Sequence, residues 1–196
     1  NAFPWYGFLG LVIVGVGEFL LFMRFWLVPV YFTPLVWSGY ILFVDALNYK
    51  VRGESLIRTR PREFLIMLPW SVACWVVFEL YNLHLQNWIY SGLPQNLFAR
   101  TIGYVWSFAT IFPAILETAD LLQPIFERFK MKPRRISQAT LRVSILFGFL
   151  SLTVPLLFPL STAKYLIAFV WLGFAFLLEP INYLLGGKSL FRYFEN

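Results

Sequence analysis

Long apolar stretches alternate with short polar connections along the whole chain. A helix needs about 20 mostly apolar residues to cross the hydrocarbon core of a bilayer, and six stretches approach or reach that length. The pattern predicts an all-α fold, a polytopic transmembrane helix bundle. Pro29 and Pro34 flank the start of the second, short stretch, so its helix either begins before Pro34 or crosses a thinned bilayer. The expected spans are 5–23, 34–49, 63–81, 101–122, 141–160 and 165–185.

Composition supports a membrane location. Of the 196 residues, 59% are hydrophobic and 13% are charged, whereas an ordinary globular domain has roughly 25% charged residues. So few ionisable groups cannot cover a surface that faces water, so most of the exterior must face lipid. This composition excludes disordered and coiled-coil chains, and the single cysteine, Cys74, excludes an internal disulfide.

Basic residues predict the orientation of the bundle. Thirteen of the 16 Lys and Arg residues lie after the second, fourth and sixth spans, and Arg24, Arg100 and Lys164 lie in the opposite connections. By the positive-inside rule, the amino terminus and the basic connections face the cytoplasm, and we expect a prokaryotic inner membrane. The same connections explain the net charge of +6, so the predicted partners are membrane lipids and other membrane subunits, not nucleic acid.

Two segments of the chain resemble each other. Residues 36–58 (VWSGYILFVDALNYKVRGESLIR) and 170–192 (VWLGFAFLLEPINYLLGGKSLFR) are identical at nine of 23 positions, with no gap and an offset of 134. Two unrelated membrane segments would share far fewer positions, so the match indicates an internal repeat. The offset superimposes the second span on the sixth and therefore the first on the fifth.

The repeat unit is therefore four helices long, and an even number of spans gives both copies the same orientation in the membrane. We expect residues 1–130 to form the first repeat and residues 139–196 the first half of the second. A basic cytoplasmic loop, residues 123–138, joins them. The missing half of the second repeat predicts that the natural protein continues past Asn196 with two more spans.

Four of the spans contain an acidic residue followed three residues later by an amide or a second acid. This spacing puts both side chains on one face of a helix. A charged side chain at the centre of a membrane helix costs about 2.5–3.5 kcal/mol on insertion scales, so we expect these faces to converge on the bundle interior. The pairs are Asp45–Asn48, Glu79–Asn82, Glu117–Asp120 and Glu179–Asn182.

The depths of these residues predict two polar layers. Glu18 and Glu79 lie in the outer half of the membrane near Asn82 and His84, and the other pairs lie near the basic connections. The functional interpretation is a proton relay, an ion site or an acid catalyst, and the structural one is that the pairs tie helices together. The structural interpretation is favoured for Asp45, Asn48, Glu179 and Asn182, and both stay open for Glu79 and Glu18. The candidate catalytic residues are Glu79, Glu18 and Asn82, and the candidate ligand-binding residues are Glu79, Asn82, His84, Trp88, Glu117 and Asp120.

Few cofactors fit this sequence. His84 is the only histidine, which excludes a haem held by two histidines of this chain, and no metal site is predicted. No cofactor is predicted, although a lipid, quinone, carotenoid or other pigment is compatible with the sequence. Tryptophans inside the spans, such as Trp37 and Trp75, are interpreted as packing. Four glycines of the first span are predicted to allow close helix contact: Gly7, Gly10, Gly15 and Gly17.

Three motifs carry a resemblance to a known family. FELYN at 78–82, NWIY at 87–90 and ETAD at 117–120 resemble a group of functionally uncharacterised prokaryotic multi-pass membrane proteins. In that group a Glu-aromatic-Asn helix end precedes a Trp-x-Tyr loop, and the pattern occurs twice in a longer chain with a duplicated four-helix unit. The resemblance implies no activity. It singles out Glu79, Asn82, Trp88 and Glu117.

The sequence contains no complete catalytic or cofactor-binding motif. The leading hypothesis is therefore a non-catalytic accessory or structural subunit of a larger membrane complex, or a binder of a lipid-soluble molecule between the repeats. One alternative is an intramembrane enzyme acting on a lipid or isoprenoid, with Glu79 as the acid and Glu18 or Asn82 in support. The other alternative is a proton-coupled transporter, which parallel repeats and buried carboxyl groups would suit.

Overall fold

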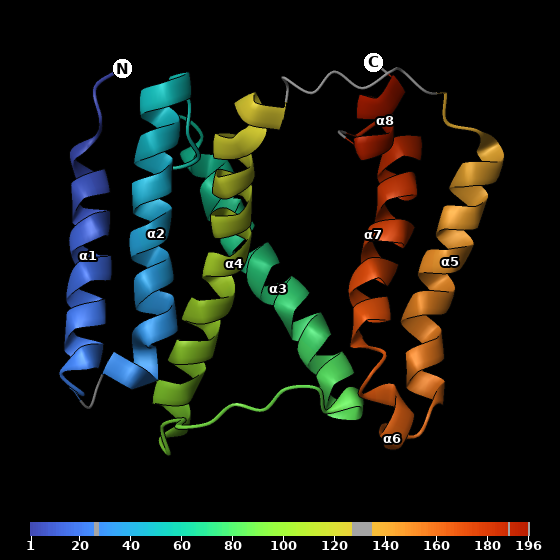
Figure 1. The fold of residues 1–196 in the computed structure, drawn as a ribbon, viewed down its shortest axis with the longest axis horizontal. Helices are drawn as coiled ribbons and strands as arrows, with labels where there is room; N and C mark the ends of the chain where they lie inside the picture. Colours follow the sequence, from blue (N-terminus) through green and yellow to red (C-terminus); the bar gives the residue numbers. More distant parts are fainter. Residues whose placement is uncertain (26–27, 127–134, 188, 196) are drawn as a thin grey trace. The chain divides into compact units, whose positions relative to one another are not determined.

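The computed structural model describes residues 1–25, 28–126, 135–187 and 189–195. This part of the chain is helical without strands, and six of its helices are long and apolar enough to cross a membrane, which confirms the predicted fold class. Much of the predicted basic loop 123–138 lies outside the described residues. The long helices are α1 (Trp5–Phe22), α2 (Val28–Arg52), α3 (Pro61–Leu85), α4 (Leu97–Phe126), α5 (Gln138–Leu157) and α7 (Ile167–Leu184), and the short ones are α6 (Leu160–Ala163) and α8 (Leu190–Glu195) (Figure 1).

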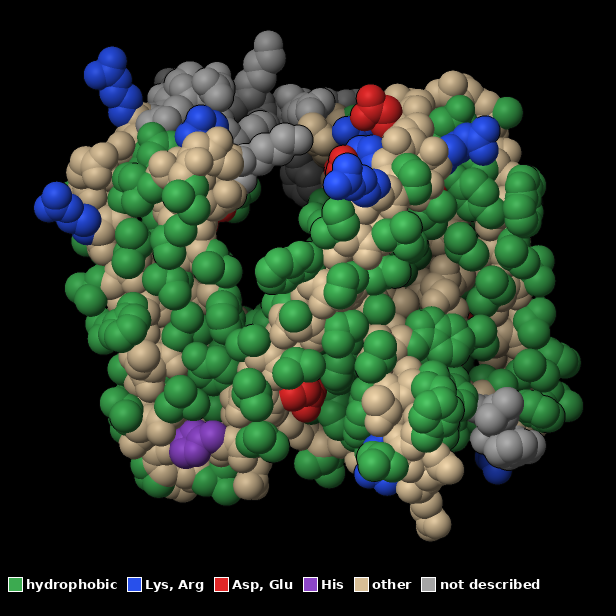
Figure 2. Space-filling model, turned by 180° about the vertical axis from the view of Figure 1, so that it is seen from behind, with side chains coloured by type: hydrophobic (Ala, Val, Ile, Leu, Met, Phe, Trp, Pro, Cys, Tyr) green, Lys and Arg blue, Asp and Glu red, His purple; other side chains and the backbone are tan. Residues whose placement is uncertain are grey.

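The helices form two compact units. Unit 1 comprises Asn1–Val77 and Tyr90–Arg128, and unit 2 comprises Phe78–Ile89 and Phe129–Asn196. Helix α3 therefore contributes its first part to unit 1 and its last turns to unit 2. Hydrophobic side chains cover most of the visible helix surface in each unit (Figure 2), as expected for helices that face lipid.

Two helix ends differ from the predicted spans because of proline. Helix α2 begins before Pro34, and its backbone leaves helical geometry at Tyr31 (φ −118°, ψ 15°). Pro34 has no N–H to donate to the preceding turn, so the helix bends there. Helix α5 ends at Leu157 because the next residue, Phe158, precedes a proline and is extended (φ −87°, ψ 149°).

Close helix crossings at glycine join the helix pairs inside each unit. A Cβ atom at Gly39 of α2 would lie 2.8 Å from the carbonyl oxygen of Gly10 in α1, so both positions need glycine. Gly148 of α5 lies equally close to the backbone of α7, and Gly173 of α7 lies against α5. The predicted helix contact of Gly15 is wrong, because nothing lies within 4 Å of a Cβ atom there.

Polar side chains fix α4 against the other helices of unit 1. The hydroxyl groups of Tyr40 in α2 and Thr118 in α4 are 2.7 Å apart and share a hydrogen bond. The Ser71 hydroxyl of α3 donates to the carbonyl of Phe108 and accepts from the N–H of Phe112 at 3.0 Å. These contacts hold α2, α3 and α4 around the two features described next, a polar cluster and an apolar cavity.

Candidate functional site: a polar cluster and an aromatic cavity

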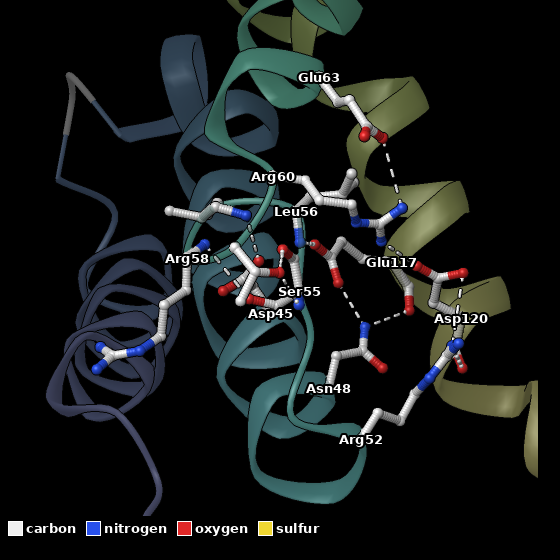
Figure 3. A network of polar contacts seen from close by, with 12 residues as sticks. Asp45, Asn48, Arg52, Ser55, Leu56, Arg58, Arg60, Glu63, Glu117 and Asp120 are labelled. Atoms are coloured by element: carbon white, nitrogen blue, oxygen red, sulfur yellow. Dashed lines mark hydrogen bonds and ion pairs between the residues drawn. The ribbon is translucent and has the colours of Figure 1, made fainter. Parts of the chain in front are cut away.

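Two buried carboxyl groups bind the connection between α2 and α3 (Figure 3). Asp45 Oδ1 accepts the N–H of Ile57 at 2.7 Å, and its Oδ2 accepts the Tyr6 hydroxyl at 2.6 Å. Glu117 Oε1, from α4, accepts the N–H of Leu56 at 3.0 Å. Both carboxyl side chains are fully buried. They satisfy two consecutive backbone amides that have little access to water.

Further polar groups link this connection to α4. Asn48 Nδ2 donates to the backbone carbonyl of Glu117 at 2.9 Å and to Glu117 Oε2. Arg60 Nη2 binds Asp120 Oδ2 at 2.9 Å, and Arg52 Nη1 donates to the Asp120 carbonyl at 2.6 Å. The structure thus brings the predicted pairs of α2 and α4 together in one cluster beside arginines. Their oxygens act as acceptors for loop and helix groups.

The second of the two matched segments, residues 170–192 in unit 2, has the same local geometry as the first. Glu179 Oε1 accepts the N–H of Phe191 at 3.0 Å, and these residues correspond to Asp45 and Ile57 at the offset of 134. Glu179 therefore holds the segment after α7 as Asp45 holds the segment after α2. Its pair partner Asn182 lies next to this segment, because the N–H of Gly187 donates to the Asn182 carbonyl at 2.9 Å.

Two further contacts recur at the same offset. The N–H of Arg58 donates to Ser55 Oγ at 3.3 Å, and that of Arg192 donates to Ser189 Oγ at 3.1 Å. The guanidinium of each arginine also lies over a tyrosine ring, at 4.5 Å in unit 1 and 5.6 Å in unit 2. Burial differs, however: Leu56 is 2% exposed and its counterpart Leu190 is 64% exposed.

The FELYN and NWIY motifs meet at the end of α3, in unit 2. Asn82 Oδ1 accepts the N–H groups of Asn87 and Trp88 at 2.9 and 3.1 Å, and its Nδ2 donates to the Trp88 carbonyl at 2.9 Å. Glu79 Oε1 accepts the Trp88 indole N–H at 3.1 Å. His84 Nε2 lies 3.1 Å from the carbonyl of Phe158. These candidate residues brace the turn after the helix.

The remaining candidate, Glu18, is exposed on α1 in unit 1, and Glu79 belongs to unit 2. In the residues that the structure describes, no three His, Cys, Asp or Glu side chains gather as a metal site would require. Neither polar region therefore has the donor set of a metal centre among these residues.

A cavity of about 510 Å³ lies within unit 1, among the first halves of α2 and α4, the middle of α3 and the segment before α4. It lies toward the opposite ends of α2 and α4 from the polar cluster. A volume of 300–1,000 Å³ and mostly apolar walls are typical of small-molecule sites. Six aromatic residues line it: Tyr31, Trp37, Trp75, Tyr90, Tyr104 and Phe108.

The bend in α2 shapes this cavity. Where the helix is interrupted, Tyr31 extends to α4 and donates its hydroxyl to the Ala99 carbonyl at 3.1 Å. The Tyr31 ring packs against α4 at Gly103, where a Cβ atom would lie in van der Waals contact, 3.4 Å from Tyr31 Cε1. Pro29 and Pro34 also line the cavity. The prolines on either side of Tyr31 are the signals in the sequence that could have indicated it.

Arg100 is the one charged residue among those that line the cavity. Its Nε–H donates to the Pro94 carbonyl at 3.0 Å. Its two terminal nitrogens form no hydrogen bond or ion pair with any residue in the described part of the chain. The sequence alone places Arg100 in an outer connection and indicates packing for Trp37 and Trp75, so it does not predict this site.

Comparison with known proteins finds no matching family model, no matching curated protein and no matching solved structure. The function must therefore be argued from the geometry of this chain.

Proposed function

We propose that this chain is a multi-pass membrane protein that binds a lipid-soluble molecule in the aromatic cavity of unit 1. The observation that carries the proposal is the cavity itself, with a volume of about 510 Å³ and walls that are mostly apolar and include six aromatic side chains. Sites for small apolar molecules combine such walls with a few polar groups. Because this cavity lies within unit 1, we assign the ligand to it and not to the boundary between repeats.

The buried acids support a binding protein over an enzyme or a proton carrier. Both oxygens of Asp45 and of Glu117 already accept hydrogen bonds from the protein, from Tyr6, Ile57, Leu56 and Asn48. A proton relay or an acid catalyst needs an oxygen that is open to substrate or water. These acids instead satisfy backbone groups that would be costly to bury alone.

We also infer that the two halves arose by duplication and share one orientation. The repeated bonds from Asp45 to Ile57 and from Glu179 to Phe191 support common ancestry beyond the nine identical positions. The asymmetry of Lys and Arg supports a cytoplasmic location for the amino terminus and the basic connections, and we assign the protein to a prokaryotic inner membrane.

Filling the cavity tests the binding function. Ser107 lines the cavity, whereas Leu116 on the same helix is exposed and lines no part of it. In detergent, the purified protein should bind the fluorescent methyl ester of cis-parinaric acid saturably. Ser107→Trp should abolish this binding, and Leu116→Trp should preserve it. Equal binding by both variants would refute the proposal, provided that both melt like the parent protein.

An accessory role in a larger complex is a second candidate, and the exposure of Leu190 favours it. In unit 1 the corresponding Leu56 is 2% exposed, with its N–H bound to Glu117 of α4, whereas Leu190 is 64% exposed. We infer that a helix with an acidic side chain, packed as α4 packs in unit 1, covers Leu190 in the assembled protein.

The matched control for this second candidate is Leu185. It is 81% exposed, and its counterpart in unit 1, Val51, is also 63% exposed, so no partner should cover it. Leu190→Arg should shift the native-gel mass of the mildly solubilised protein to that of the isolated chain, and Leu185→Arg should not. A single mass for the parent protein, equal to that of the chain alone, would contradict the candidate.

A further inference from the structure

The cavity holds a charge in an otherwise apolar setting. Charged side chains within membrane bundles are costly and mark ligand or ion sites unless they are paired. Arg52 and Arg60, in the same unit, bind Asp120, whereas the structure gives Arg100 no acidic partner in the described part of the chain. The guanidinium of Arg100 therefore differs from these arginines in having no anion to compensate its charge.

The position of Arg100 leaves its strongest donors available. The hydrogen bond from Nε–H to the Pro94 carbonyl orients the guanidinium plane. The two terminal nitrogens then present N–H groups that can bind a carboxylate or a phosphate in bidentate fashion, which is the preferred geometry of arginine with such anions. The hydroxyl groups of Thr33 and Ser91 also belong to the lining and add weaker donors.

The rest of the lining suits an apolar tail. Beyond Arg100, it consists mainly of aromatic rings and of aliphatic side chains such as Ile111 and Ile115 on α4. Ile115 is 59% exposed, so this wall continues onto the outer surface of the helix, where lipid tails would lie. An amphiphile could therefore enter from the bilayer with its tail along α4 and its head group at Arg100.

We infer that the ligand is a single-chain amphiphile with an anionic head group, a carboxylate or a phosphate, which the guanidinium of Arg100 binds. This inference rests on the proposed binding function and adds the chemical class of the ligand. The two head groups share the same chemistry at Arg100, so the experiment below includes both.

The test compares two probes that differ only in charge. cis-Parinaric acid, ionised at alkaline pH, carries the head group that Arg100 should bind, and its methyl ester does not. We expect the purified protein to bind the acid about tenfold more tightly than the ester, or better. Arg100→Gln should lower the affinity for the acid to that of the ester and so remove this preference, while a melting temperature like that of the parent protein shows that the variant is folded. Arg62 is an exposed arginine at the start of α3, before its apolar stretch. The control variant Arg62→Gln should keep the preference for the acid.

Competition identifies the natural class of head group. Hexadecyl phosphate and palmitate should each displace the ester at lower concentration than hexadecanol, and the more potent of the two indicates the head group that the site prefers. Equal affinity for acid and ester in the parent protein would overturn the inference while the binding function stood. Binding that is not saturable, or that Ser107→Trp leaves intact, would instead refute the binding function.

Discussion

Replacing Glu117 by alanine tests whether the buried acids hold the chain together. The substitution removes the acceptor of the Leu56 N–H and one of the two acceptors of the Asn48 amide. Leu56 is only 2% exposed, so water cannot readily replace the lost acceptor. A buried amide left without a partner costs about 1–3 kcal/mol, and a typical hydrogen bond contributes about 0.5–1.5 kcal/mol. We therefore expect a loss of about 2–4 kcal/mol of stability in unit 1.

Limited proteolysis measures this loss locally. Arg58 lies in the connection that Glu117 holds, and trypsin cleaves after it only when the connection opens. When opening and closing are fast, cleavage follows the population of the open form, so a loss of about 2–4 kcal/mol raises the rate by roughly 30- to 10³-fold. The rate is followed by mass spectrometry of the detergent-solubilised protein.

Glu63→Ala is the matched control. The Glu63 side chain is 60% exposed and forms an ion pair with Arg60 at 3.5 Å, and exposed ion pairs contribute at most about 1 kcal/mol. Its cleavage rate should change by less than about fivefold. If Glu117→Ala is cleaved no faster than Glu63→Ala, the carboxyl group of Glu117 does not secure the connection. The structural interpretation of the polar cluster would then fail.

Two further substitutions test the helix contacts. Gly10→Ala should destabilise unit 1 by about 1–3 kcal/mol, because the new methyl group meets the backbone of α2. Gly15→Ala, where the space is open, should be neutral or stabilising by up to about 1 kcal/mol. Equal melting temperatures of the two variants would contradict the close crossing of α1 and α2. Asn82→Ala removes three hydrogen bonds to Asn87 and Trp88 and should speed amide hydrogen exchange at Trp88 by about tenfold or more. Unchanged exchange would mean that Asn82 does not stabilise the turn after α3.

The spans could be predicted from the sequence because lipid imposes one strong requirement, a run of apolar residues long enough to cross it. Two of the differences from the predicted bounds are local effects of proline. Helix α2 begins before Pro34, which was one of the two alternatives for this span, and α5 ends at Leu157, three residues short of the predicted end, because Phe158 precedes a proline. A proline in an apolar run signals a bend or an end equally well, so its neighbours decide the outcome.

The sequence could predict which polar residues share a helix face, but not which groups they contact. Spacing put Asp45 and Asn48 on one side of a helix, and the structure joins that side to Glu117. The donor from which each acid accepts a hydrogen bond could not be predicted, because partners such as Leu56 and Glu117 are 61 residues apart in the sequence. The cavity depends on the backbone at Tyr31, where the helix opens, and no periodicity indicates such a position.

Asp45, Glu117 and Glu179 share one physical cause. A connection that folds back against the helix ends buries backbone N–H groups where little water reaches, and each such group needs an acceptor. An acid about one helical turn or more before the helix ends can reach the connection that follows, as Asp45 reaches Ile57 and Glu179 reaches Phe191, each 12 residues ahead. Asp45, Glu117 and Glu179, which suggested chemistry in the sequence, are thus explained by architecture. Arg100, which no such requirement explains, is the charge that points to a ligand.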